Sequence, residues 1–170
     1  MQHAEDQIRD VVCSMWVSTA SYPLEYRGMH FAFCSEECRE RFLGNPGLYI
    51  GRPGEPAAKQ SGEVWRKSRR IHLGRPLDQH QAEQVMNRLD ALMSVTAIWP
   101  GADMLEVSYD LMQITARQIE GALEAAGADL GGGWSDRLKR SFIHLLEETE
   151  SASREVRSTA DAGHSGHGGH

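Results

Sequence analysis

The cysteines are the residues of this chain whose type and spacing can do chemistry. There are three, Cys13, Cys34 and Cys38, and only three residues separate the last two. Thiolates are soft ligands that suit Zn(II) and Cu(I). Cys34 and Cys38 stand at the start of a charged, helix-like segment, where free backbone N–H groups and the positive end of the helix dipole favour the thiolate. The spacing therefore predicts a soft-metal site.

Three thiols leave a closed zinc site one ligand short, because such a site takes four. His30 is one candidate, since it lies at even spacing on the strand leading to Cys34 and would share its face. Met15, just after Cys13, is another. Two alternatives need neither residue: three-coordinate Cu(I), or a site shared across a homo-oligomer. The competing interpretation without metal is three free core thiols.

The C-terminal end offers a second, weaker metal-binding pattern. His164, His167 and His170 are spaced three apart among glycines. Imidazoles on a flexible chain can collect Ni(II), Cu(II) or Zn(II). A neutral end without a metal role is the other interpretation of these residues.

The sequence around the cysteines resembles the YHS domain, a member of the TRASH group of heavy-metal-binding modules. The resemblance covers about residues 10–50 and rests on the segments Asp10–Val17, Tyr26–Gly28 and Phe33–Cys38. The usual proline and glycine beside the first cysteine are replaced here by Val12 and Ser14. The resemblance implies a small treble-clef-like fold, with a knuckle, a hairpin and a helix, and metal binding by the three cysteines.

The elements that must position these thiols follow from turn residues and hydrophobic spacing, which predict an α+β protein. Residues 64–133 read as β-α-β-β-α with a short last strand near 128–130, which is the ferredoxin-like plan. The full predicted order is a metal module at 8–50, a linker at 51–63, the ferredoxin-like domain at 64–133, a helix at 134–152 and a disordered tail at 153–170.

The predicted ferredoxin-like domain is similar in plan to the heavy-metal-associated (HMA) domain. That family binds metal through a Cys-x-x-Cys loop before its first helix, and the corresponding positions here are Asp78 and Gln81. The metal site of that family is therefore absent from this region, and its function does not carry over. A docking or dimerising surface is the expected role.

Composition narrows the function classes. The net charge of −6 disfavours nucleic-acid binding. The chain has no apolar run long enough for a transmembrane helix, and its polar start does not resemble a signal peptide. We therefore expect a cytoplasmic protein with reduced thiols. No nucleophile set, phosphate-binding loop or carboxylate pair indicates an enzyme, although Cys34 and Cys38 form an alternative redox pair.

These observations predict a cytoplasmic protein that binds Cu(I) or Zn(II) and acts in metal trafficking, buffering or sensing. Its partners would be the metal ion and a transporter or regulator protein. The alternative is a zinc-stabilised interaction module in which the metal is purely structural.

Overall fold

The computed structural model describes residues 6–160. These residues belong to two compact units. We call the first, residues up to Val64 together with those from Thr149 onward, the cysteine unit. The second, Trp65–Glu148, is the sheet unit. No helix of the described part is long and apolar enough to cross a membrane.

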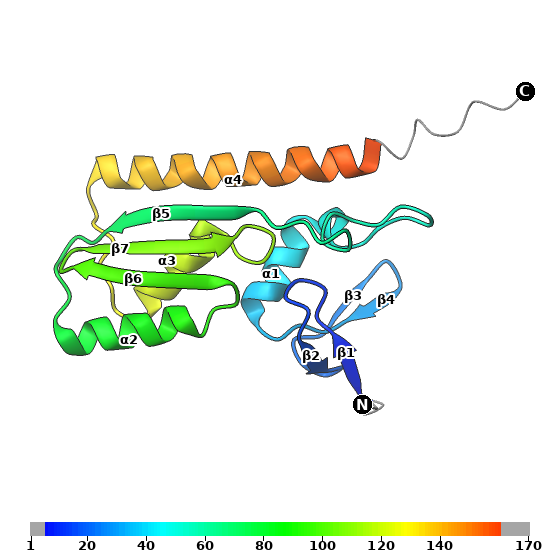
Figure 1. Ribbon diagram of the computed structural model, residues 1–170, viewed down its shortest axis with the longest axis horizontal. Helices are drawn as coiled ribbons and strands as arrows, with labels where there is room; N and C mark the ends of the chain where they lie inside the picture. The colour runs from blue at the N-terminus through cyan, green and yellow to red at the C-terminus, as the bar shows by residue number, and fades with distance from the viewer. Residues whose placement is uncertain (1–5, 161–170) are drawn as a thin grey trace, which may run out of the picture. The chain divides into compact units, whose positions relative to one another are not determined.

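The cysteine unit begins with two short hairpins followed by a helix (Figure 1). Its elements are β1 (Gln7–Arg9), β2 (Trp16–Ser18), β3 (Leu24–Tyr26), β4 (Met29–Phe31), α1 (Glu36–Gly44) and the 3-10 turn η1 (Pro46–Leu48). Strand β1 pairs with β2, and β3 pairs with β4 through a tight turn in which Arg27 and Gly28 both have positive φ. Such turns match the twist of the strands they join.

An aromatic cluster forms the centre of the cysteine unit. Phe42 of α1 is fully buried, and its ring centre lies 4.9 Å from that of Phe31 and 5.4 Å from that of Phe33. Ser35 caps α1, because its hydroxyl accepts a hydrogen bond from the Cys38 N–H. The C-terminal part of helix α4 (Trp134–Ala160) belongs to this unit, and its Glu155 accepts a hydrogen bond from the Gly47 N–H at 2.7 Å.

The sheet unit has the predicted β-α-β-β-α order, so the α+β class is confirmed. Its elements are β5 (Arg66–His72), α2 (Gln79–Asp90), β6 (Val95–Gly101), β7 (Met104–Asp110), α3 (Ala116–Ala125) and the first part of α4 (Trp134–Ala160). Strand β7 lies between β5 and β6 and is antiparallel to both (Figure 1). The two outer strands are therefore parallel, which is the split βαβ arrangement.

One face of this sheet is covered and the other is open. On β7, Leu105, Val107 and Tyr109 alternate inward and join a core with α2 and α3. On the opposite face, Arg70 forms an ion pair with Glu106, and both side chains are solvent-exposed. Helices α2 and α3 begin at capping boxes, formed by Asp78 with Gln81 and by Thr115 with Gln118.

Two predicted features differ from the structure. Residues 128–130 form no strand, although Ala128 and Leu130 are buried in the core. Helix α4 continues to Ala160, beyond the predicted end at 152, because residues 153–160 contain neither glycine nor proline to stop it. The predicted disordered tail at 153–170 is thus helical up to Ala160, and residues 161–170 lie outside the described part.

Candidate metal centre

The three cysteines meet at the start of α1. Cys13 comes from the turn between β1 and β2, Cys34 precedes the helix, and Cys38 lies in its first turn. The Sγ atom of Cys34 is 3.5 Å from that of Cys13 and 3.5 Å from that of Cys38. All three are free thiols in the structure. The predicted convergence of the cysteines is thus present in the fold.

The sulfur spacing fits a single bound ion. Thiolates bound at about 2.3 Å to one tetrahedral Zn(II) lie about 3.8 Å from one another. The two 3.5 Å separations are close to this value, so an ion could sit among the sulfurs with only small side-chain movement. Cys13 and Cys34 are partly exposed, whereas Cys38 is buried. One side of the site is therefore open to incoming and leaving ligands.

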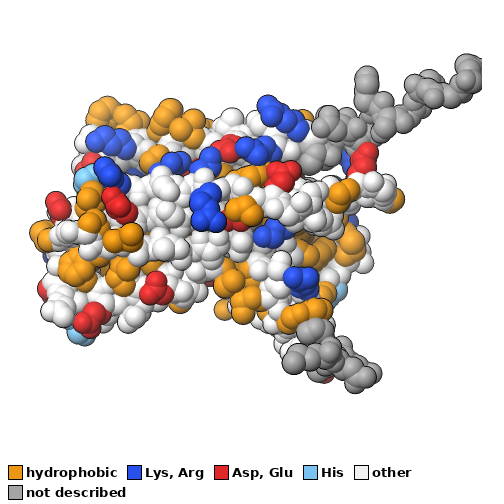
Figure 2. Space-filling model, viewed as in Figure 1, with side chains coloured by type: hydrophobic (Ala, Val, Ile, Leu, Met, Phe, Trp, Pro, Cys, Tyr) orange, Lys and Arg blue, Asp and Glu red, His pale blue; other side chains and the backbone are white. Residues whose placement is uncertain are grey.

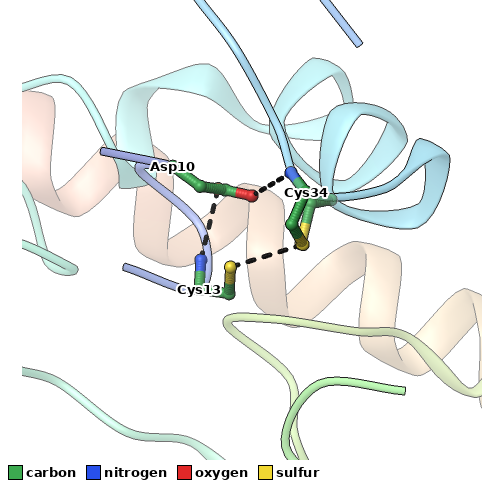
Figure 3. A group of neighbouring side chains, drawn as sticks. Asp10, Cys13 and Cys34 are labelled. Carbon is green, nitrogen blue, oxygen red and sulfur yellow. Dashed lines mark hydrogen bonds between the residues drawn. The ribbon is translucent and has the colours of Figure 1, made fainter. Parts of the chain in front are cut away.

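Asp10 is the acidic residue that completes this group. Its carboxylate lies with the three Sγ atoms in a set whose ligand atoms are all within 4.8 Å of one another. Figure 3 shows Asp10 directed at the backbone of Cys13 and Cys34. Oδ1 accepts from the N–H groups of Val12 at 2.8 Å and Cys13 at 3.3 Å, and Oδ2 accepts from the Cys34 N–H at 2.9 Å. Asp10 thus ties the two cysteine-bearing segments together.

Asp10 could serve the site in two ways. Each carboxylate oxygen has more than one lone pair, so Asp10 can orient the cysteines and still donate an oxygen to an ion. Its side chain is 0% exposed, and burial raises the pKa of this carboxyl above the ordinary value. A cation beside it would reverse this effect, because it stabilises the charged carboxylate. A buried acid that would gain from a cation supports metal binding here.

Hydrogen bonds among the three thiols shift their pKa values in different directions. Cys34 is central, and its hydrogen bonds with Cys13 and then with Cys38 lower the pKa of the Cys34 thiol far below its usual range. The pKa of the Cys13 thiol is raised, chiefly by its hydrogen bond with Cys34. The pKa of the Cys38 thiol is raised by its hydrogen bonds with Cys13 and Cys34. An ion bound by all three sulfur atoms would displace the protons that the thiols carry.

The structure does not bring His30 into this group. Its Nδ1 is 2.7 Å from Glu25 Oε1, and its Nε2 is 2.9 Å from the Thr19 carbonyl oxygen. The expected shared face with Cys34 is not formed, because β4 ends at Phe31 and strand alternation stops there. Both ring nitrogens of His30 thus have hydrogen-bond partners away from the cysteines, one in β3 and one just after β2.

Met15 and the histidines of the tail stay predictions as ligands. The side chain of Met15 is exposed, at 44%. The histidines of the tail, His164, His167 and His170, lie outside the described residues. Asp10 was not among the site residues predicted from the sequence, although it stands three residues before Cys13 in the segment that carries the family resemblance.

Comparison with known proteins supports the assignment of this segment. Residues 8–52 match the family model of the YHS domain. No curated protein and no solved structure matches the chain. The matched segment contains Asp10 and all three cysteines, and it ends before the sheet unit begins. The part of the chain that holds the candidate metal centre is therefore a YHS domain.

Proposed function

We propose that this protein is a cytoplasmic carrier, buffer or sensor of a soft metal ion. The observation that carries the proposal is the cluster of Cys13, Cys34 and Cys38, in which the Cys34 sulfur lies 3.5 Å from each of the other two and two thiols are partly exposed. Soft thiolates favour Cu(I) and Zn(II) over hard cations. Partial exposure lets a competing thiolate reach the ion, which transfer to another protein requires.

Binding rather than catalysis is the role that we propose for this site. The chemistry-bearing side chains of the group are thiols and one carboxylate, and the carboxylate oxygens already accept three backbone N–H groups. A transporter or regulator protein that presents its own thiolates would be the receiving partner. The sheet unit, which has no cysteine, would recognise that partner.

A structural zinc module is the second candidate, and Asp10 favours it. A buried carboxylate beside three thiolates supplies the fourth ligand that a closed zinc site needs. In this version the ion would bind tetrahedrally and leave slowly. In the carrier version Cu(I) would be held by the three sulfurs alone, with Asp10 only orienting the backbone.

An anaerobic titration separates these functions. Reduced apo-protein is titrated with Cu(I) and, separately, with Zn(II), each against a competing chelator, and the metal content is checked by elemental analysis. One Cu(I) bound far more tightly than Zn(II) supports the carrier, whereas one slowly exchanging Zn(II) supports the structural module. Binding of neither ion would refute the metal function.

Two variants make this test specific. Cys34→Ser removes the central sulfur and should abolish stoichiometric binding. Leu43→Ala changes an exposed residue of the same unit whose side chain offers no ligand atom, so it should bind as the wild type does. Equal loss in both variants would show that the binding does not depend on the cluster.

A further inference from the structure

Helix α4 exposes a stripe of large apolar side chains in the sheet unit. The stripe consists of Trp134, Leu138, Phe142, Leu145 and Leu146. These side chains are between 50% and 79% exposed. Figure 2 shows hydrophobic side chains gathered at the upper left, where Figure 1 draws the N-terminal part of α4. Contiguous apolar surface of this kind marks an interaction site.

The stripe is a true helix face and is not explained by packing within the unit. At about 100° per residue, Leu138, Phe142 and Leu145 fall within an arc of roughly 60°, whereas Glu147 lies on the opposite side. Glu147 is the residue that the fold buries: its carboxylate accepts hydrogen bonds from the Tyr109 hydroxyl and from the Ala116 N–H. The helix is thus anchored by its polar face and turns its apolar face to solvent.

The spacing of the stripe fits a second helix. The step from Leu138 to Phe142 is four residues and that from Phe142 to Leu145 is three, the alternation by which paired helices interlock. From Trp134 to Leu146 the stripe is about 18 Å long. Two copies packed face to face would bury on the order of 1,000 Å² in total, about the lower limit for a specific interface.

The charged residues beside the stripe indicate which partner helix fits it and in which direction that helix runs. Arg137 and Glu148 flank the same side of the stripe, and Lys139 flanks the other side. In an antiparallel pair centred near Phe142, Arg137 of each copy lies beside Glu148 of the other. In a parallel pair, Arg137 would instead face Lys139 of the second copy, and like charges repel. The flanks are therefore self-complementary only when the helices run in opposite directions.

We propose that the protein forms a homodimer through antiparallel pairing of the α4 stripes of two copies. Glu148 already pairs with Arg117 at 2.8 Å, but both side chains are well exposed, so this pair is weak and can be exchanged or shared. The interface uses no cysteine. Dimerisation is therefore independent of the metal function, and either proposal can fail without the other.

Sedimentation equilibrium of the full chain tests the dimer. The experiment is run between about 1 and 100 µM protein, with reductant and chelator present so that neither disulfides nor metal can link two copies. We expect a concentration-dependent dimer that Phe142→Glu converts to a monomer without loss of helical circular dichroism. Val64→Glu, which charges another exposed apolar residue outside the stripe, should still dimerise.

Charge reversal tests the direction of pairing. Arg137→Glu should weaken the dimer about five- to tenfold, because it places two acidic groups together at each end. The double variant Arg137→Glu/Glu148→Lys should restore the wild-type affinity. A double variant as weak as the single one would overturn the antiparallel arrangement.

Other outcomes identify other occupants. A wild-type protein that stays monomeric throughout the range would overturn the dimer. Binding of that monomer to vesicles of mixed zwitterionic and anionic phospholipid, lost in Phe142→Glu, would show that a lipid surface covers the stripe instead. Equal dissociation by Val64→Glu would also overturn the assignment, because the effect would then not belong to the stripe.

Discussion

The two units of this protein reach stability by different means. In the cysteine unit, each strand of the first two hairpins has three residues, and each hairpin is a separate two-stranded sheet. In the sheet unit, three seven-residue strands form one sheet, and sixteen buried residues form its core with the helices. Isolated two-stranded hairpins are marginally stable in water, whereas a covered three-stranded sheet can stand alone.

This difference between the two units indicates which of them a bound metal ion would stabilise. In the cysteine unit, the turn that carries Cys13 and the start of α1 are joined by Asp10 and by the sulfur cluster. In the sheet unit, the strands are joined by continuous ladders and apolar packing. A metal ion should therefore stabilise the first unit and leave the second almost unchanged.

Metal removal should have the largest effect and act on one unit only. Chelation of the reduced, Zn(II)-loaded protein should cost the cysteine unit on the order of 10 kcal/mol of folding free energy. Amide hydrogen exchange should then become fast in β3, β4 and α1, while β5 and β7 remain protected. Added Zn(II) should restore the slow exchange. Continued protection of α1 in chelator, or loss of protection in β7, would break the contrast between the units.

Two buried aspartates offer a matched test of the same contrast. Asp10 accepts from three backbone N–H groups in the cysteine unit. Asp110 does similar work in the sheet unit, where it accepts from the N–H groups of Trp65 at 2.9 Å and Met112 at 3.0 Å. Asp10→Asn and Asp110→Asn should each destabilise their own unit by about 2 kcal/mol, because an amide NH₂ would face N–H donors.

Only the Asp10 change should affect metal. Asp10→Asn should weaken Zn(II) binding about 10- to 100-fold, since the carboxylate orients or joins the ligand set. Asp110→Asn should leave the affinity unchanged, and chelator competition measures both. Equal affinities for the two variants would show that Asp10 is structural only.

The aspartate at position 10 also shows what the sequence could and could not predict. Local features were predictable: Ser35 caps α1 and Thr115 caps α3 because their partners are three residues away. Asp10 was missed because one of its partners, the Cys34 N–H, is 24 residues away and is brought close only by the fold. The interpretation of His30 as a ligand assumed that strand alternation continued past Phe31, where β4 in fact ends.

The positive φ of one residue in the cysteine unit predicts a smaller change in the stability of that unit. Ser14 has a φ of 69° in the turn between β1 and β2. A side chain is unfavourable in this left-handed region by about 1–2 kcal/mol, and glycine removes that penalty. Ser14→Gly should therefore stabilise the metal-free cysteine unit by about 1 kcal/mol, as measured by urea unfolding.

In the β3–β4 turn of the same unit, the opposite substitution, glycine to a residue with a side chain, can be made at a position with positive φ. Gly28 has a φ of 74° and open space around the position of a Cβ atom. Gly28→Ala should therefore destabilise the unit through backbone strain alone, by about 1 kcal/mol. Neither change should shift the unfolding of the sheet unit. Stabilisation by both substitutions would mean that the φ values do not control the effect.

The smallest predicted effect concerns the pKa of His30, which tests whether the β3–β4 hairpin is independent of the metal centre in the same unit. Its hydrogen bond with the Thr19 carbonyl, followed by that with Glu25, raises the pKa of His30 above its ordinary value. The protonated form is thus favoured by folding, so its small contribution to stability is present below the ordinary pKa and is lost as pH rises through the folded value. In an NMR titration, Glu25→Gln should lower the pKa of His30, whereas loading with Zn(II) should leave it unchanged. Loss of its titration on metal loading would instead make His30 a ligand and extend the metal-dependent region into the β3–β4 hairpin.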